Sequence, residues 1–152
     1  MQFLELKIPP PVLGPLAFVM MLALWRGQCC PLSNPWSIPM AALLGVIGLA
    51  FTFPSLLRFR NASTTILPTH PERAARLVTS GMYRFSRNPM YLGATLILLA
   101  IGLYFDDGLA LLPVPLFAVY LNFFQIIPEE RALDRLFGEE YRDYKKRVRR
   151  WI

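Results

Sequence analysis

The chain has 152 residues, of which 55% are hydrophobic and 17% charged, and its formal net charge is +6. An average soluble domain has roughly 25% charged residues, so this composition argues against a soluble globule, and its many apolar side chains exclude a disordered chain. Basic chains commonly bind nucleic acid or an anionic membrane. Because the basic residues flank long apolar runs, we expect the lipid bilayer as partner and no nucleic acid. With one histidine and two cysteines, no metal site is expected.

Four apolar runs divide the chain. They cover about residues 9–25, 38–57, 89–105 and 109–127, and no Asp, Glu, Lys or Arg interrupts them. A helix needs about 20 mostly apolar residues to cross a bilayer, and the runs lack the alternation of barrel strands. We therefore expect an all-α polytopic membrane protein of about four transmembrane helices in one domain, residues 1–152. Gly45 and Gly48 lie one turn apart and are expected to let another helix approach closely.

The distribution of charge predicts the orientation of these helices. Lys and Arg concentrate in the loop of residues 58–88 and in the tail of residues 128–152, whereas the other two loops hold only Arg26 or two aspartates. The positive-inside rule then places the loop, the tail and both termini in the cytoplasm. The short connection at residues 106–108 predicts a tight antiparallel hairpin, which would bring the segment before Pro89 beside the segment after Pro128.

Polar residues gather on both sides of that hairpin. Pro89 suits the first turn of a helix, and the free N–H groups there, with Arg87 beside them, could hold an anionic group. The alternative is that Arg87 contacts lipid head groups only. Glu129 and Glu130 are adjacent, so on a helix they must face different partners, although simple stabilisation of the helix start would also explain them. Gln125 lies one turn before Glu129 and is expected to share its face.

The tail carries a repeating apolar pattern. The residues that recur every three or four positions are Leu133, Phe137, Tyr141, Tyr144, Val148 and Trp151. This pattern predicts a C-terminal amphipathic cytoplasmic helix on the membrane surface, with Arg149 and Arg150 on lipid head groups. In the central loop, Thr69 to Glu72 fits a capping box, which predicts a short helix through Val78.

Two stretches resemble a known family. They read LVTSGMY at 77–83 and RNPMYLG at 87–93, and the tail adds Glu129-Glu130, FGEEY at 137–141 and YKKRV at 144–148. Together they resemble the isoprenylcysteine carboxyl methyltransferases and their prokaryotic relatives. Those enzymes usually have His where this chain has Asn88, and Asn-Pro-Met-Tyr is closer to the membrane phospholipid N-methyltransferases. The resemblance implies an integral protein of a prokaryotic inner membrane.

The activity implied by the resemblance is methyl transfer from S-adenosyl-L-methionine to a lipid-like or hydrophobic substrate that enters from the bilayer. No Gly-x-Gly-x-x-Gly motif is present, in agreement with a family that lacks the Rossmann domain. Two alternatives stay open. One is an NADPH-dependent membrane reductase of the sterol reductase type, which shares a related Arg-x-Pro-x-Tyr motif; the other is a non-enzymatic lipid-binding protein.

The resemblance also assigns roles to individual residues. It implies catalytic roles for Arg87 and Glu129, and substrate binding by Gln125 and Glu129. The residues expected to line the cofactor pocket are Arg76, Leu77, Val78, Tyr83, Asn88, Pro89, Met90, Tyr91 and Glu130. The methyl acceptor and the oligomeric state stay open.

Overall fold

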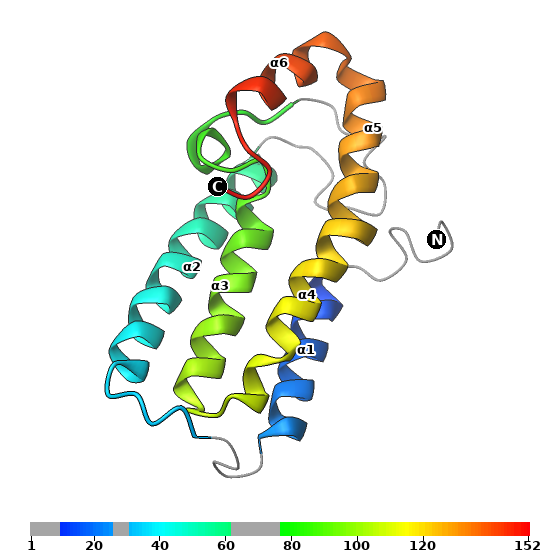
Figure 1. The fold of residues 1–152 in the computed structure, drawn as a ribbon. Coiled ribbons are helices and arrows are strands. Elements are labelled where there is room, and N and C mark those ends of the chain that lie inside the picture. Colours follow the sequence, from blue (N-terminus) through cyan, green and yellow to red (C-terminus); the bar gives the residue numbers. More distant parts are fainter. Residues whose placement is uncertain (1–9, 26–30, 62–76) are drawn as a thin grey trace.

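A computed structural model describes residues 10–25, 31–61 and 77–152, and within these ranges the regular structure is helical. The helices α1 (Pro10–Leu24), α2 (Ser37–Asn61), α3 (Pro89–Tyr104) and α4 (Pro113–Leu121) form a bundle (Figure 1). Short 3₁₀ turns, η3 (Gly81–Arg84) and η4 (Leu109–Leu111), precede α3 and α4. Helix α4 continues through a π-helical turn, η5 (Asn122–Ile126), into α5 (Ile127–Phe137), and α6 (Glu139–Arg147) follows. The predicted all-α class is confirmed.

Two of the described helical segments are long and apolar enough to cross a membrane. They are Ser37–Leu57 within α2 and the continuous segment Leu109–Phe137. The segments Pro11–Leu24 and Pro89–Tyr104 are apolar but shorter. Helices therefore occupy all four predicted positions, while a crossing by all four stays a prediction. Large apolar side chains such as Val19, Val46 and Leu49 are exposed, which suits a surface that faces lipid.

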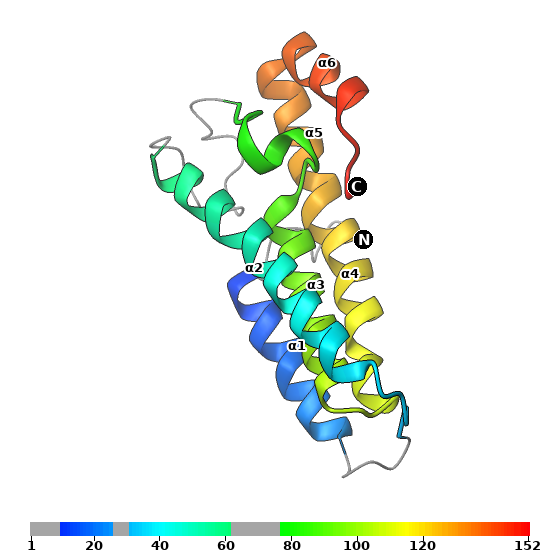
Figure 2. The same ribbon diagram turned by 90° about the vertical axis from the view of Figure 1, so that its left-hand side faces the viewer.

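Helices α2 and α3 pack along each other (Figure 2). A Cβ atom added to Gly48 would lie 2.8 Å from the carbonyl oxygen of Gly93, and one added to Gly93 would lie 2.6 Å from the carbonyl oxygen of Gly48. No side chain fits at either position without moving a backbone. The close approach predicted for Gly48 is confirmed, whereas at Gly45 an added Cβ would make only ordinary contact, 3.9 Å from Ala100.

Helices α3 and α4 are joined by the tight connection expected from the sequence. Asp106 adopts a positive φ of 50°, and Asp107 is fully buried and accepts the N–H of Leu109 at 2.9 Å through Oδ1.

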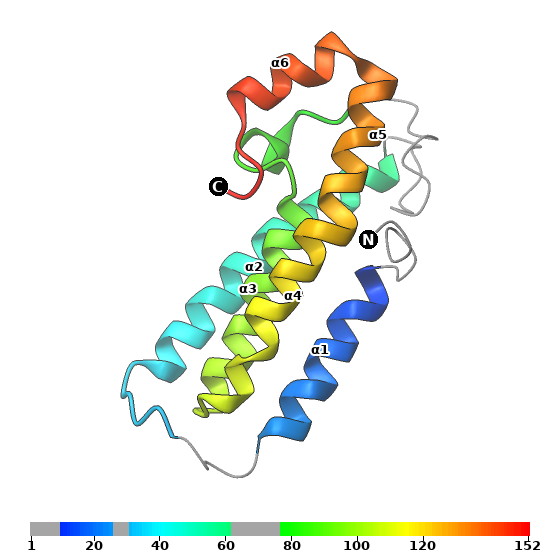
Figure 3. The same ribbon diagram turned by 45° about the vertical axis from the view of Figure 1, so that its right-hand side comes forward.

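Helix α1 packs along α4 (Figure 3). The apolar core between α1, α3 and α4 includes Met21, Leu98 and Leu121.

The tail differs from the single amphipathic helix that was predicted. Gly138, at φ 52°, ends α5 and separates it from α6. The apolar face of these helices packs around Tyr83, Tyr141 and Tyr144, against the segment before α3. The predicted helix after Thr69 lies largely outside the described residues; Leu77 and Val78, which are described, are not helical.

Candidate active site

The segment before α3 is fixed by the end of the chain, which we call the C-terminal strap (residues 148–152). The backbone N–H of Arg87 donates to the carbonyl oxygen of Arg149 at 3.0 Å. The side chain of Asn88 donates to the carbonyl oxygen of Arg150 at 3.0 Å, and the hydroxyl of the buried Ser86 donates to the same oxygen at 3.3 Å. The strap therefore lies beside the start of α3 (Figure 1), and it holds Arg87 in place.

The carboxylate of Glu130, from α5, is bound by two guanidinium groups. Arg87 Nη2 lies 3.0 Å from Glu130 Oε1, and the two side chains are only 10% and 9% exposed. Arg150 binds the same carboxylate with Nη2 at 2.7 Å and Nε at 3.1 Å, and its Nη1 donates to Asn122 at 3.2 Å. The hydrogen bond to Glu130 raises the pKa of Arg150. Both oxygens of the Glu130 carboxylate are therefore bound by arginine side chains.

The Arg87 side chain is only partly satisfied by these contacts. Its Nε and Nη1 are buried and have no hydrogen-bond partner in the described part of the chain. A buried donor without a partner costs about 1–3 kcal/mol, and more when it is charged. Such groups in a folded protein call for a physical explanation, of which a bound ligand is one. The planar guanidinium fork matches a carboxylate or a phosphate.

Glu129 faces a different partner from Glu130, as their adjacency predicted. The hydroxyl of Tyr91, from α3, donates to Glu129 Oε1 at 2.7 Å. The Tyr91 ring also packs against the apolar core, so this residue connects the charged cluster with the bundle interior. Gln125 is buried in η5, one turn before Glu129. π-Helical turns often occur at functional sites, because they shift side chains relative to a regular helix.

Three buried tyrosines pack together next to the cluster, Tyr83 from η3 and Tyr141 and Tyr144 from α6. The hydroxyl of Tyr144 donates to the carbonyl oxygen of Tyr83 at 2.6 Å, and the rings of Tyr141 and Tyr144 lie 6.2 Å apart. Burial raises the pKa of Tyr144 to about 12 and raises the pKa values of Tyr83 and Tyr141 well above their ordinary range. All three phenols therefore stay protonated at neutral pH and hold the segment before α3 as neutral groups.

The fold brings most of the predicted site residues to one end of the bundle. Arg87, Asn88, Tyr91, Glu129 and Glu130 share the contacts described above. Pro89 is buried at the first turn of α3, and the next residue, Met90, is half-buried. Three further predicted residues pack in the tyrosine cluster; they are Leu77, Val78 and Tyr83. Arg76 lies outside the described residues.

Arg150, Asn122 and Ser86 were not assigned to the cluster from the sequence. The assignment of Arg150 to lipid head groups was wrong, because its guanidinium is bound to Glu130 and Asn122. No local signal distinguishes Arg150 from Arg147 or Arg149 in the same basic run. Asn122 did carry a signal, since a polar residue near the end of an apolar run tends to face a partner. For Ser86 the sequence offers no signal other than its position next to Arg87.

The structure is a helical bundle with a charged site at one end, and two of its described helical segments are long and apolar enough to cross a membrane. The chain belongs to the phospholipid methyltransferase family, which it matches over residues 36–140. Membership implies methyltransferase activity and a membrane location, and it confirms the resemblance to the phospholipid enzymes. Nothing in the comparisons supports the reductase or the non-enzymatic alternative.

One relative comes from Haemophilus influenzae and is described as an uncharacterized protein. It is 51% identical to this chain over 63 residues, which are 41% of this chain and the whole of the relative. No solved structure matches the chain.

Proposed function

We propose that this protein transfers a methyl group from S-adenosyl-L-methionine to a lipid-like substrate that reaches the site from the bilayer. The observation that carries the proposal is that Arg87 Nε and Nη1 are buried beside the N-terminus of α3 and have no partner among the residues that the structure describes. The cofactor supplies an electrophilic methyl group when bound, and it carries a carboxylate, an ammonium group and a ribose diol for the protein to hold.

The residues of the cluster fit these groups. The carboxylate suits the buried donors of Arg87, of which Nε and Nη1 have no partner in the described residues. The N-terminus of α3 adds to the attraction, because Asn88 makes no side-chain hydrogen bond to the first turn and the helix dipole is positive there. Glu130 suits the ammonium group or the diol. The other cofactor contacts implied by the resemblance, from Arg76 to Tyr91, remain part of this proposal.

In this proposal Glu129 and Tyr91 would meet the methyl acceptor. The Tyr91 ring contacts the apolar core while its hydroxyl holds Glu129, so an acceptor that enters between helices would meet this carboxylate first. Glu129 would orient an N–H or O–H of the acceptor, with Gln125 as a further contact. Methyl transfer is an in-line displacement that depends mainly on positioning and on exclusion of water. The strap and the tyrosine cluster would contribute to that enclosure.

The acceptor is expected to be a lipid amine, thiol or acid and not a prenylated protein. In this chain Asn88 stands in place of the histidine of the prenylcysteine enzymes, and its side chain binds the strap. The cytoplasmic orientation of the cluster, inferred from the basic loop and tail, would give the site access to soluble cofactor.

The test is transfer of an isotope-labelled methyl group by the purified protein in nanodiscs made from bacterial lipids, with a farnesylcysteine analogue in a parallel reaction. We expect label in the lipid fraction and little in the analogue. Glu129→Gln should lower kcat more than it weakens cofactor binding, and Arg84→Ala, an exposed neighbour of the site, should change neither. Label in the analogue alone would overturn the substrate proposal.

A further inference from the structure

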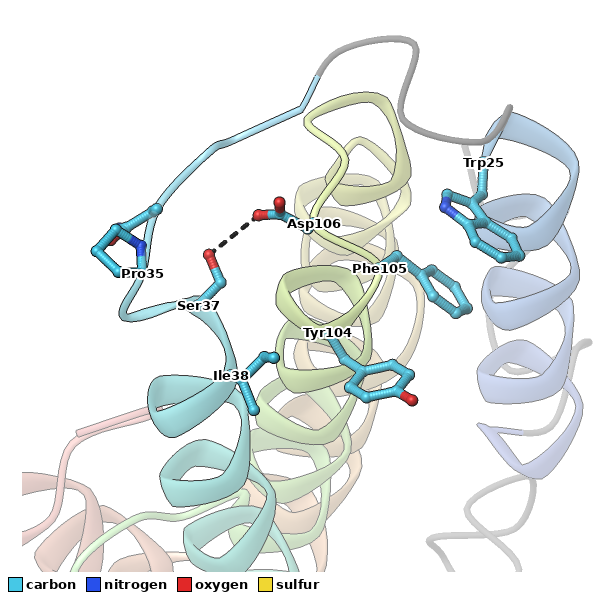
Figure 4. A pocket seen from close by; sticks show the side chains of 8 residues that line it. Trp25, Pro35, Ser37, Ile38, Tyr104, Phe105 and Asp106 are labelled. Atoms are coloured by element: carbon cyan, nitrogen blue, oxygen red, sulfur yellow. Dashed lines mark hydrogen bonds between the residues drawn. The ribbon is translucent and has the colours of Figure 1, made fainter.

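A cavity of about 440 Å³ lies at the opposite end of α3 from the Arg87 cluster. The 16 residues of α3 separate the two sites by about 24 Å. The end of α1, the start of α2 and the end of α3 surround the cavity (Figure 4). Its volume is in the range of small-molecule sites, roughly 300–1,000 Å³. Its occupant would be too far from Arg87 to be the methyl acceptor.

One side of this cavity carries a single negative charge. Among the described residues, Asp106 is the only charged side chain that lines it, and the hydroxyl of Ser37 donates to Asp106 Oδ1 at 3.2 Å. The backbone holds Asp106 at a φ of 50°, where few residues other than glycine, asparagine and aspartate are found. The N–H of Leu32 donates to the carbonyl oxygen of Asp106 at 3.2 Å and so helps to hold this conformation.

The other side of the cavity is aromatic. The rings of Trp25 and Phe105 stack with their centroids 4.9 Å apart, and the ring of Tyr104 lies 6.4 Å from that of Phe105 (Figure 4). Aromatic faces attract cations, most strongly quaternary ammonium groups, and a carboxylate attracts them too. The carboxylate side and the aromatic side of the cavity are therefore both complementary to an organic cation such as a substituted ammonium group.

The surroundings indicate that the ligand is an amphiphile. Trp25 and Trp36 are both exposed at this end of the bundle, where an aromatic belt would mark the boundary between lipid and water. Ile38 lines the cavity and is 66% exposed at the start of α2, so an alkyl chain could continue from the cavity along the apolar outer surface of that helix.

We propose that this cavity binds the ammonium head group of an amphiphile, with Asp106 as the counter-charge and Trp25, Tyr104 and Phe105 as the aromatic wall. The inference does not depend on the methyltransferase reaction. Binding here would hold a cationic or zwitterionic lipid at the membrane face opposite to the Arg87 cluster.

The test is calorimetric titration of the intact protein, in a neutral detergent, with octyltrimethylammonium, tetramethylammonium and octyl sulfate. The variants are Asp106→Asn, Trp25→Leu and, as matched control, Asp107→Asn. Asparagine tolerates the positive φ and can still accept from Ser37, so Asp106→Asn removes little besides the charge. Asp107 does not line the cavity, and asparagine there can still accept the N–H of Leu109.

The parent and Asp107→Asn should bind octyltrimethylammonium alike, whereas Asp106→Asn and Trp25→Leu should each bind it roughly three- to thirtyfold more weakly. Uptake into detergent micelles is the same for every variant and cancels in this comparison. Equal affinity for tetramethylammonium would identify a small soluble cation as the ligand instead of an amphiphile. Equal affinity of Asp106→Asn and the parent, or equally tight binding of octyl sulfate, would overturn the proposal.

Discussion

Arg87 meets Glu130 through one guanidinium nitrogen, Nη2, at 3.0 Å, and leaves its other two nitrogens buried without a partner in the described residues. Arg150, by contrast, approaches the same carboxylate with Nη2 and Nε together. The two arginines therefore differ in their contacts. Arg150 is engaged with Glu130 and Asn122, while Arg87 still has two buried nitrogens, Nε and Nη1, that can donate to a ligand.

Replacement of Arg87 by alanine should weaken binding of S-adenosylhomocysteine, because a carboxylate loses its charged partner in a largely desolvated place. Charge-assisted hydrogen bonds contribute roughly 1.5–3 kcal/mol, which corresponds to about tenfold to over a hundredfold in affinity. Calorimetric titration measures the effect. Arg84→Ala removes the same charge from an exposed position nearby and should bind as the parent does; equal losses in both variants would point to bulk charge and not to a pocket.

Replacement of Arg150 by alanine should loosen the C-terminal strap and leave Glu130 with Arg87 alone. We expect a lower melting temperature and an affinity for S-adenosylhomocysteine reduced by roughly tenfold, about the effect of one charge-assisted hydrogen bond. Arg149→Ala is the matched control, because its side chain is exposed and its carbonyl oxygen can still accept the N–H of Arg87. If the two variants behave alike, the cluster does not depend on the Arg150 side chain.

Gly48→Ala should destabilise the packing of α2 on α3, since the new Cβ would lie 2.8 Å from the Gly93 carbonyl oxygen. Overpacking of this kind costs about 1–3 kcal/mol and should lower the melting temperature in detergent by several degrees. Gly14→Ala, in α1, places its Cβ where no other atom lies within 4 Å, and the better helix propensity of alanine should leave stability equal or higher. A Gly48→Ala protein as stable as the parent would contradict this account of the helix contact.

The orientation can be tested with reporter fusions. A reporter that is active only in the cytoplasm should work when fused after Ile152 and fail when inserted at Asp107, because the basic loop and tail favour the cytoplasmic side. The opposite pattern would place the Arg87 cluster on the side without cofactor and would contradict the proposed function.

Some of these features could be predicted from the sequence because they depend on local patterns. Uninterrupted apolar runs predicted the four long helices, and Pro89 marked the start of α3. The adjacency of Glu129 and Glu130 predicted two different partners, since consecutive helical residues point in different directions. The hairpin at residues 106–108 then brought those partners within reach.

The position of Arg150 could not be predicted in the same way. It depends on the break between α5 and α6 at Gly138 and on backbone hydrogen bonds from the strap to residues before α3. A basic run near an apolar face predicts lipid head groups equally well, and only the path of the folded chain decides between the two. The cavity near Asp106 could not be predicted from the sequence either, because the residues that line it lie at the ends of three separate helices.

The most direct test of the central claim is titration of the purified parent protein with S-adenosylhomocysteine and, separately, with NADPH, in the same detergent. The account predicts saturable binding of S-adenosylhomocysteine, weakened in Arg87→Ala and kept in Arg84→Ala, and no comparable binding of NADPH. A parent protein that binds NADPH and not S-adenosylhomocysteine, or that binds S-adenosylhomocysteine equally well without Arg87, would contradict it.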